Sequence, residues 1–215
     1  QILYYLGENL AVRSEEFAKR IVSMTGEDLA SATREVELSI DRLFTYAAWA
    51  DKFDGAVHGA PLRGVALAMN EPVGVIGMIC PDENPLLGMV SLLAPALAMG
   101  NVVVAIPSEP FPLSATDLYQ VFETSDLPSG VVNLITAKHA EVAETLAGHM
   151  DLDAVWYFGS SGQSEIIEKA SATNLKRTWV NHGFARDWLD SMKGEGKEFL
   201  HQATEVKNVW IPYGE

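Results

Sequence analysis

The chain has 215 residues, which is enough for one sizeable hydrophobic core and a small additional element. Its formal net charge is −14, and this excess of acids argues against binding to nucleic-acid phosphates or to anionic membranes. The one cysteine, Cys80, excludes an internal disulfide and fits a reducing, cytoplasmic setting. We therefore expect a globular protein with no nucleic-acid or membrane partner.

Two amphipathic helices are predicted at the start of the chain. The first covers residues 1–22, and the second has an apolar stripe over residues 36–47, with Ser31 or Thr33 as its N-cap. Because helical spacing begins at once and no signal peptide opens the chain, the sequence predicts a segment of a longer protein.

A projecting hairpin and a C-terminal strand are predicted to form a small β element. The glycine- and proline-punctuated stretch after the helices has extended runs at 55–58 and 63–69. The last residues, ATEVKNVWIPYGE, form another extended run, which needs a sheet edge because one strand alone is unstable. The hairpin is the expected edge, in the same chain or in a neighbour.

Five apolar strands alternate with four helices over residues 73–180. Strands of this kind are buried on both faces, and helical crossovers make them parallel. We predict the α/β class, with a doubly wound, mostly parallel five-stranded sheet of the Rossmann-like kind. The strands are expected at residues 73–79, 102–106, 131–135, 154–158 and 176–180, and the helices at 84–100, 112–125, 140–149 and 160–172.

The uncharged stretch 84–108 has the composition of a membrane span. Pro95 and residues 99–101 interrupt it, and its second part is β-branched. A buried helix followed by a buried strand explains it better.

The carboxyl ends of the predicted strands mark the expected ligand crevice, because open doubly wound sheets bind ligands there. The residues expected to line it are Cys80, Ile106, Gly159 and Asn181.

The stretch FGSSGQS at 158–164 has two interpretations. The start of the next helix, with Ser160, could bind an anion, or Ser160 and Gln163 could form a capping box.

Other reactive side chains have structural explanations. Cys80 has only Asp82 and Glu83 as titratable neighbours, which disfavour a thiolate, so a small buried hydrophobe is predicted. The two acids suit the start of a helix. His182, beside Asn181, has no nucleophile to serve, and Lys138 and His139 are expected in a loop. No histidine has a His or Cys partner at metal-ligand spacing, so no metal is predicted; the histidines are His58, His139, His149, His182 and His201.

Several ordered motifs resemble the aldehyde dehydrogenase superfamily over nearly the whole chain. The hairpin and the tail, HQATEVKNVWIPYG, resemble the family's bridging hairpin and C-terminal strand, which make oligomer contacts. The resemblance implies a cofactor domain and an NAD(P)-dependent oxidation of aldehydes to acids, with a cysteine nucleophile. The cofactor-domain motifs are EPVGVIGMICP, APALAMGNVVVAIPSEPFPLSA, LPSGVVNLIT, FGSS and NLKRTWVNHG.

The chain departs from the family's catalytic pattern. Glu83 stands where the oxyanion-binding asparagine belongs, and Asn181 begins the motif that should carry the base. In the family, roughly 200 residues with the nucleophile separate the last parallel strand from the C-terminal strand, where this chain has only about 20, and Cys80 does not match the nucleophile. The pattern is most similar to the shortened second segment of the two-segment family 16 members.

The cofactor motifs depart in part. Ile106 replaces the lysine that holds the adenosine ribose, and Ser164 replaces a glycine of the nucleotide turn. Glu109, Gly159 and Ser160 remain as degenerate cofactor-binding candidates. Ala137 stands where the family has a glycine after the third strand of the sheet.

From these departures we expect a non-catalytic pseudoenzyme segment that carries no cofactor and acts in dimerisation and scaffolding. Its partners would be a second copy, through residues 54–70 and 204–213, and a preceding aldehyde-dehydrogenase-like segment of the same polypeptide. Two alternatives stay open: a residual NAD(P)-binding regulatory module, or part of an active NAD-dependent enzyme whose catalysis lies in another segment. The expected division is a Rossmann-like domain of residues 1–53 and 71–185, an oligomerisation element of 54–70 and 203–215, and a linker of 186–202.

Overall fold

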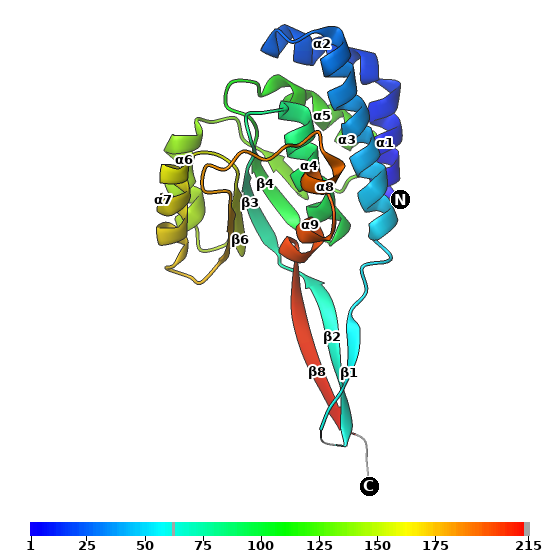
Figure 1. Ribbon diagram of the computed structural model, residues 1–215, viewed down its shortest axis with the longest axis vertical. Helices are drawn as coiled ribbons and strands as arrows, with labels where there is room; N and C mark the ends of the chain where they lie inside the picture. The colour runs from blue at the N-terminus through cyan, green and yellow to red at the C-terminus, as the bar shows by residue number, and fades with distance from the viewer. Residues whose placement is uncertain (62, 213–215) are drawn as a thin grey trace.

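The computed structural model describes residues 1–61 and 63–212 (Figure 1). Its N-terminal part is a layer of three helices: α1 at Ile2–Val12, α2 at Ser14–Thr25 and α3 at Leu29–Trp49. The first predicted helix is therefore two helices, because the backbone leaves helical geometry at Arg13, with φ −102° and ψ 12°.

The start of α3 corrects the predicted cap. Asp28 is the N-cap residue, and its Oδ1 accepts hydrogen bonds from the N–H groups of Ala30 and Ser31 at 2.9 and 3.0 Å. Ser31 instead donates its hydroxyl to Asp28, and Thr33 donates its own to the carbonyl of Leu29. Both predicted cap residues lie inside the helix, which begins about one turn earlier than predicted.

The central sheet confirms the predicted fold class. It has five parallel strands in the order β5–β4–β3–β6–β7. The continuous apolar runs form these strands because both faces of the sheet are covered by helices. The strands are β3 at Val75–Ile79, β4 at Val102–Ile106, β5 at Val132–Leu134, β6 at Ala154–Tyr157 and β7 at Arg177–Val180.

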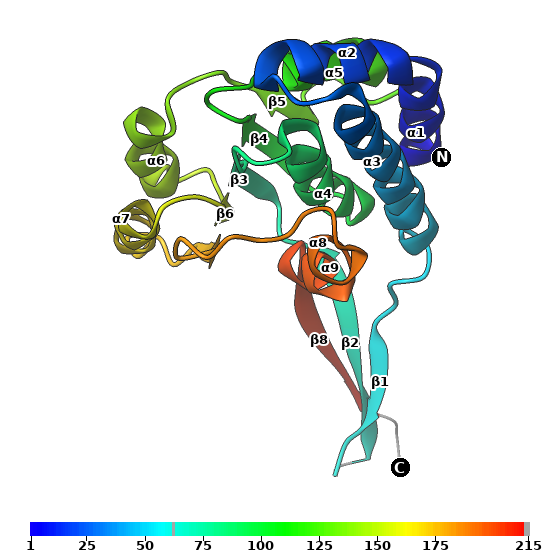
Figure 2. The same ribbon diagram turned by 45° about the horizontal axis from the view of Figure 1, so that its top comes forward.

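Two groups of helices cover the two faces of this sheet (Figure 2). The helices α4 at Pro85–Ala98 and α5 at Leu113–Glu123 lie with α1–α3 on one face. The helices α6 at His139–Gly148 and α7 at Ser161–Ser171 lie on the other. Side chains alternate along β6, so Trp156 packs into the larger core and Tyr157 into the smaller one.

The small β element is a three-stranded antiparallel sheet that projects from the body (Figure 1). It consists of β1 at Ala56–Gly59, β2 at Gly64–Pro72 and β8 at Thr204–Pro212. The tail strand pairs with the hairpin of its own chain, along the whole of β2. Residue 62 of the hairpin and residues 213–215 of the predicted tail lie outside the described residues.

The interval 186–202 contains two short helices, α8 at Ser191–Gly194 and α9 at Lys197–Gln202. Trp188 and Phe199 from this interval are fully buried in the larger core. The expected linker is therefore packed structure, while the division into domains stays a prediction. Among the described residues, no helix is both long and apolar enough to cross a membrane.

Candidate functional site

A cavity of about 270 Å³ lies at the carboxyl ends of the central strands. A smaller one of about 90 Å³ adjoins it and is also lined by Glu83 and Gly159. Of the four residues predicted to line the crevice, Gly159 and Asn181 do so, whereas Cys80 and Ile106 lie buried behind it. The larger cavity is lined by Asp82, Glu83, Glu109, His139, Ala140, Tyr157, Phe158, Gly159, Ser160 and Gln163.

The turn from β6 into α7 is held from the neighbouring strand. The N–H of Gly159 donates to Oδ1 of Asn181 at 2.9 Å, and the side-chain amide of Asn181 donates to the carbonyl of Phe184 at 3.0 Å. Asn181 therefore fixes the turn that forms one wall of the crevice. Sequence reasoning placed Asn181 here but missed this supporting role.

Ser160 caps α7. Its hydroxyl accepts a hydrogen bond from the N–H of Gln163 at 3.4 Å. The side chain of Gln163 points instead to the carbonyl of Ala140 at 3.5 Å, so the reciprocal bond of a capping box does not form. Ser164 is buried, and its hydroxyl donates to the carbonyl of Ser160 at 3.1 Å, away from the cavity.

Glu109 caps α6 across the crevice. Its Oε2 accepts a hydrogen bond from the N–H of His139 at 2.8 Å, and its own N–H donates to Oδ1 of Asp82 at 2.9 Å. These contacts join the loops after β3 and β4 to α6. The prediction of a loop at Lys138 and His139 is wrong for His139, which begins α6 and is buried, with Nε2 2.8 Å from the carbonyl oxygen of Pro107.

Sequence reasoning missed Glu35 altogether. This residue of α3 is 1% exposed, and its Oε1 accepts hydrogen bonds from the N–H groups of Leu86 and Leu87 at 2.8 and 3.1 Å. These are the first free N–H groups of α4, since Pro85 has none. Burial raises the pKa of the Glu35 carboxyl. No local pattern could reveal a cap that comes from another helix.

The loop that precedes α4 differs from its predicted form. Asn84 occupies the N-cap position in the left-handed region, at φ 48°, and its side chain makes no capping bond. Glu35 takes that role, so Asp82 and Glu83 are left exposed at the crevice rather than serving the helix start.

Cys80 is confirmed as a buried hydrophobe. It is completely buried, and burial, with the nearby charge of Asp82, raises the pKa of its thiol. A protonated, inaccessible thiol cannot act as a nucleophile. His182 lies in the left-handed region at φ 50°, with Nε2 3.6 Å from Glu168. No cluster of three or more His, Cys, Asp or Glu side chains suited to a metal occurs in the described part of the chain.

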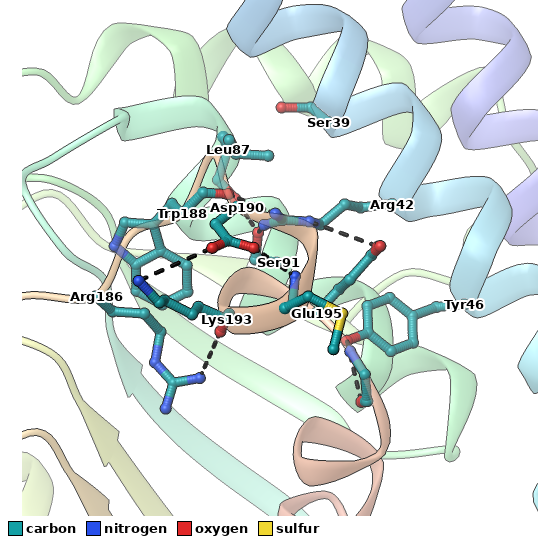
Figure 3. Close-up of polar contacts among 12 residues, drawn as sticks. Ser39, Arg42, Tyr46, Leu87, Ser91, Arg186, Trp188, Asp190, Lys193 and Glu195 are labelled. Atoms are coloured by element: carbon teal, nitrogen blue, oxygen red, sulfur yellow. Dashed lines mark hydrogen bonds and ion pairs between the residues drawn. The ribbon is translucent and has the colours of Figure 1, made fainter.

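The segment after β7 lines the smaller cavity, and Figure 3 shows the polar contacts around it. The buried guanidinium of Arg42 on α3 donates to the hydroxyl of Ser91 and the carbonyl of Trp188, and lies 3.7 Å from a carboxylate oxygen of Glu195. Burial lowers the pKa of Arg42 and raises that of Glu195. Arg42 therefore fixes this segment against α3 and α4.

Arg186 is held in the same segment. It donates to the carbonyl of Lys193 at 2.8 Å and pairs with Glu198 at 3.0 Å. Its guanidinium also lies over four aromatic rings, 5.2 to 5.9 Å from their centroids, which favours a fixed position. It lines the smaller cavity beside Asn181. The rings belong to Phe158, Trp179, Trp188 and Phe199.

Comparison with known proteins decides the family. The family model described as "Aldehyde dehydrogenase family" matches residues 1–185. The chain belongs to the aldehyde dehydrogenase family. It is 34% identical to NADP/NAD-dependent aldehyde dehydrogenase PuuC of Escherichia coli over 85% of this chain and 37% of that protein. It is 35% identical to cytosolic aldehyde dehydrogenase 1 of Mus musculus over 78% of this chain and 34% of that protein.

Solved structures give the same answer. PnpE from Pseudomonas sp. WBC-3 and PnpE in complex with nicotinamide adenine dinucleotide each match with a TM-score of 0.80 and 29% identity. These matches cover 83% of this chain and 37% of PnpE. The chain thus spans well under two thirds of the length of these relatives.

Two predictions are overturned by this membership. We expected a chain that is not an enzyme, and this is wrong at the level of the family, because the matched relatives are named as aldehyde dehydrogenases. The exchanged residues Glu83 and Asn181 do not by themselves show that the chain is inactive. The expectation of no cofactor is wrong in the same way, because a matched structure was determined with NAD.

Proposed function

We propose that this chain is the NAD-binding part of an aldehyde dehydrogenase whose nucleophile lies outside these residues. The observation that carries the proposal is the crevice at the carboxyl ends of the strands, with its Gly159–Ser160 turn, in a fold shared with an enzyme crystallised with NAD. Cys80 is the chain's one cysteine and is buried, so a cysteine nucleophile has to come from elsewhere.

The start of α7, next to the cavity-lining Ser160, and Glu109 fit a dinucleotide in two respects. The N–H groups of Ser161 and Gly162, at the start of α7, have no acceptor within the described residues, so they can donate to a phosphate. Oε2 of Glu109 accepts from His139, while its Oε1 has no hydrogen-bond partner among residues 1–61 and 63–212, which suits a ribose hydroxyl. When bound, NAD supplies the hydride acceptor of dehydrogenase chemistry, while these residues orient it.

The charge of the crevice limits the affinity. Asp82, Glu83 and Glu109 line the larger cavity, and no lysine or arginine of the described part of the chain lines it. Ile106, at the family's lysine position, is buried and offers no charge-assisted bond, a loss of about 1.5–3 kcal/mol. The site is therefore expected to bind NAD at least about tenfold more weakly than a site that keeps the lysine.

Isothermal titration calorimetry of the whole chain with NAD tests the proposal. Saturable binding at millimolar NAD or below is expected, and Gly159→Val should abolish it. A Cβ at position 159 would lie 2.3 Å from the hydroxyl of Tyr157, so this variant distorts the turn. Gly148→Ala, where a Cβ meets nothing within 4 Å, is the matched control. Absence of binding by the unmodified chain contradicts the proposal.

We further propose that the projecting sheet assembles a homodimer through residues 54–70 and 204–213. Support comes from β8, an edge strand of nine residues, and from exposed apolar side chains on it. An extended edge of this kind can pair with a second copy through main-chain hydrogen bonds. The exposed apolar residues of this sheet are Val57, Met69, Val206, Trp210 and Ile211.

Light scattering tests the dimer. A dimer is expected for the full chain and a monomer after removal of residues 204–215. Trp210→Glu keeps the backbone pairing and should also give a monomer, whereas Met150→Glu, on the body and similarly exposed (67% against 63%), should not. An oligomeric state unchanged by both the truncation and Trp210→Glu contradicts this assembly.

A third proposal concerns the place of the chain in a longer protein. We propose that it is the second segment of a two-segment, family 16-like member, with an aldehyde-dehydrogenase-like segment before it as a partner. The partial span of its relatives supports this, since the chain covers 37% of PuuC. Sequencing of the complete transcript checks it, and an upstream region without the family's motifs would contradict it.

A further inference from the structure

Tyr157 is the last residue of β6, and its hydroxyl reaches the floor of the crevice. The ring is 3% exposed and packs in the smaller core with Ile79, Ile106 and Ile167. The residue nevertheless lines the cavity of about 270 Å³, because the end of its side chain meets the β6–α7 turn. A buried ring therefore presents one polar atom to the proposed nucleotide site.

That hydroxyl already binds the turn. It accepts a hydrogen bond from the N–H of Ser160 at 2.8 Å and lies 3.4 Å from the hydroxyl of Ser160. The chain passes so close to the phenol that a Cβ at Gly159 would lie 2.3 Å from its oxygen. The contact is thus a normal hydrogen bond within a turn that only glycine permits at this position.

The bond has a consequence for phosphate binding. The N–H of Ser160 carries one hydrogen, and the phenol oxygen lies where an acceptor must lie to receive it. The N–H groups of Ser161 and Gly162 have no acceptor to displace within the described residues, but a ligand phosphate can take the N–H of Ser160 only by displacing the phenol. A phosphate that takes this N–H therefore binds with a less favourable free energy, because the internal bond has to break first.

We propose that Tyr157 sets the affinity of the crevice for phosphate-containing nucleotides by competing with the ligand for the N–H of Ser160. The inference rests on the proposed NAD site and adds a determinant of specificity to it. Nucleosides without a phosphate do not meet this competition. The hydroxyl of Tyr157 acts through its hydrogen bond to Ser160, whereas the ring alone fills the core.

The test compares Tyr157→Phe with the unmodified chain by calorimetry, using NAD, ADP and adenosine. The variant keeps the ring and removes the competing oxygen, so NAD and ADP should bind about three- to tenfold more tightly, with adenosine unchanged. Tyr119→Phe is the matched control, since its hydroxyl donates to the carbonyl of Val132 at 3.2 Å, away from the crevice. It should change nothing.

A second measurement does not depend on any variant. In the unmodified chain, the amide NMR signal of Ser160 should move when NAD saturates the site, because its acceptor changes from phenol to phosphate. Two results would overturn the role of Tyr157: a Ser160 signal that does not move, or phosphate-containing ligands that bind Tyr157→Phe no more tightly than the unmodified chain. In either case, NAD binding by the unmodified chain would still uphold the proposed site. If neither protein binds NAD, the proposed function and this inference both fail.

Discussion

The crevice and the projecting sheet differ in how their surface groups are covered. In the crevice, the helix starts are bound by the chain's own side chains: Glu35 at α4, Glu109 at α6, and Tyr157 with Ser160 at α7. In the sheet, β8 leaves apolar side chains such as Trp210 exposed and forms an open edge. Internal contacts thus bind most of the polar groups at these helix starts, with the N–H groups of Ser161 and Gly162 left for a ligand, whereas the sheet is suited to contact with another macromolecule.

Burial, and not distance along the chain, accounts for this difference, because both regions join residues that are far apart in the sequence. The capping bond from Glu35 to Leu86 joins residues 51 positions apart, and the bond from Arg42 to Trp188 spans 146. Glu35 and Arg42 are both buried, and satisfied buried polar contacts of this kind rigidify a core. The projecting sheet also pairs distant residues, such as Gly64 with Pro212, but it buries little apolar surface of its own.

The largest expected effect tests whether the body depends on its internal polar contacts. Arg42→Met removes the buried charge and leaves the carbonyl of Trp188 and the carboxylate of Glu195 without their partner. The free energy of unfolding should fall by about 3 kcal/mol. Urea denaturation, read from the transition midpoint at constant slope, measures it.

The same helix offers a control. Arg34 pairs with Glu37 at 4.0 Å on the exposed face, so Arg34→Met should change the free energy of unfolding by less than about 0.5 kcal/mol. Equal effects of the two substitutions would remove the distinction between internal contacts and surface contacts.

The second effect concerns the charge of the crevice. NADP carries a 2′-phosphate, and the carboxylates of Asp82, Glu83 and Glu109 would repel it. NAD should therefore bind about tenfold more tightly than NADP in parallel titrations at low salt. The preference should narrow as ionic strength rises, because exposed charges are screened. Equal affinity at low salt would mean that the carboxylates face away from the ligand.

The fold could be predicted from sequence to a large extent, because it depends on local patterns. Apolar runs located the five parallel strands, and the helix predicted from residue 84 begins at Pro85. The break at Arg13 was missed, since the apolar stripe continues across it. The capping of α3 by Asp28 was assigned one turn too late because several side chains there could cap.

The site was less predictable, because its contacts join distant segments. Asn181 and Gly159 were placed correctly, since each follows a strand. Cys80 and Ile106 also end or follow strands, but their side chains point into the core. Whether a residue at a strand end faces the crevice depends on side-chain direction, which a uniformly apolar strand does not reveal.

A third, smaller effect tests the support of the crevice wall. Asn181→Ala removes the acceptor for the N–H of Gly159 and the donor to the carbonyl of Phe184. The turn should loosen, and NAD affinity should fall about fivefold, equivalent to one hydrogen bond. Calorimetry measures the affinity, with Asn133→Ala at β5 as a control remote from the cavity. Unchanged affinity would show that the turn holds without Asn181.

The smallest expected effect is a change in how the free energy of unfolding depends on pH. Burial raises the pKa of Glu35 above its ordinary value of 4.5, so the folded protein binds this proton more tightly than the unfolded chain. That stabilisation is complete below pH 4.5 and is lost as pH rises through the folded-state pKa. The free energy of unfolding of Glu35→Gln minus that of the unmodified chain should therefore rise across this window. A difference independent of pH would show that burial does not perturb Glu35.

NMR titration of the whole, nitrogen-15-labelled chain with NAD tests the central claim most directly, because it reports binding and its location together. The amide signals of Gly159, Ser161 and Gly162 should shift saturably, and those of β1, β2 and β8 should not. If millimolar NAD moves no signal at the crevice, or moves the signals of the projecting sheet instead, the carboxyl-end crevice is not an NAD site.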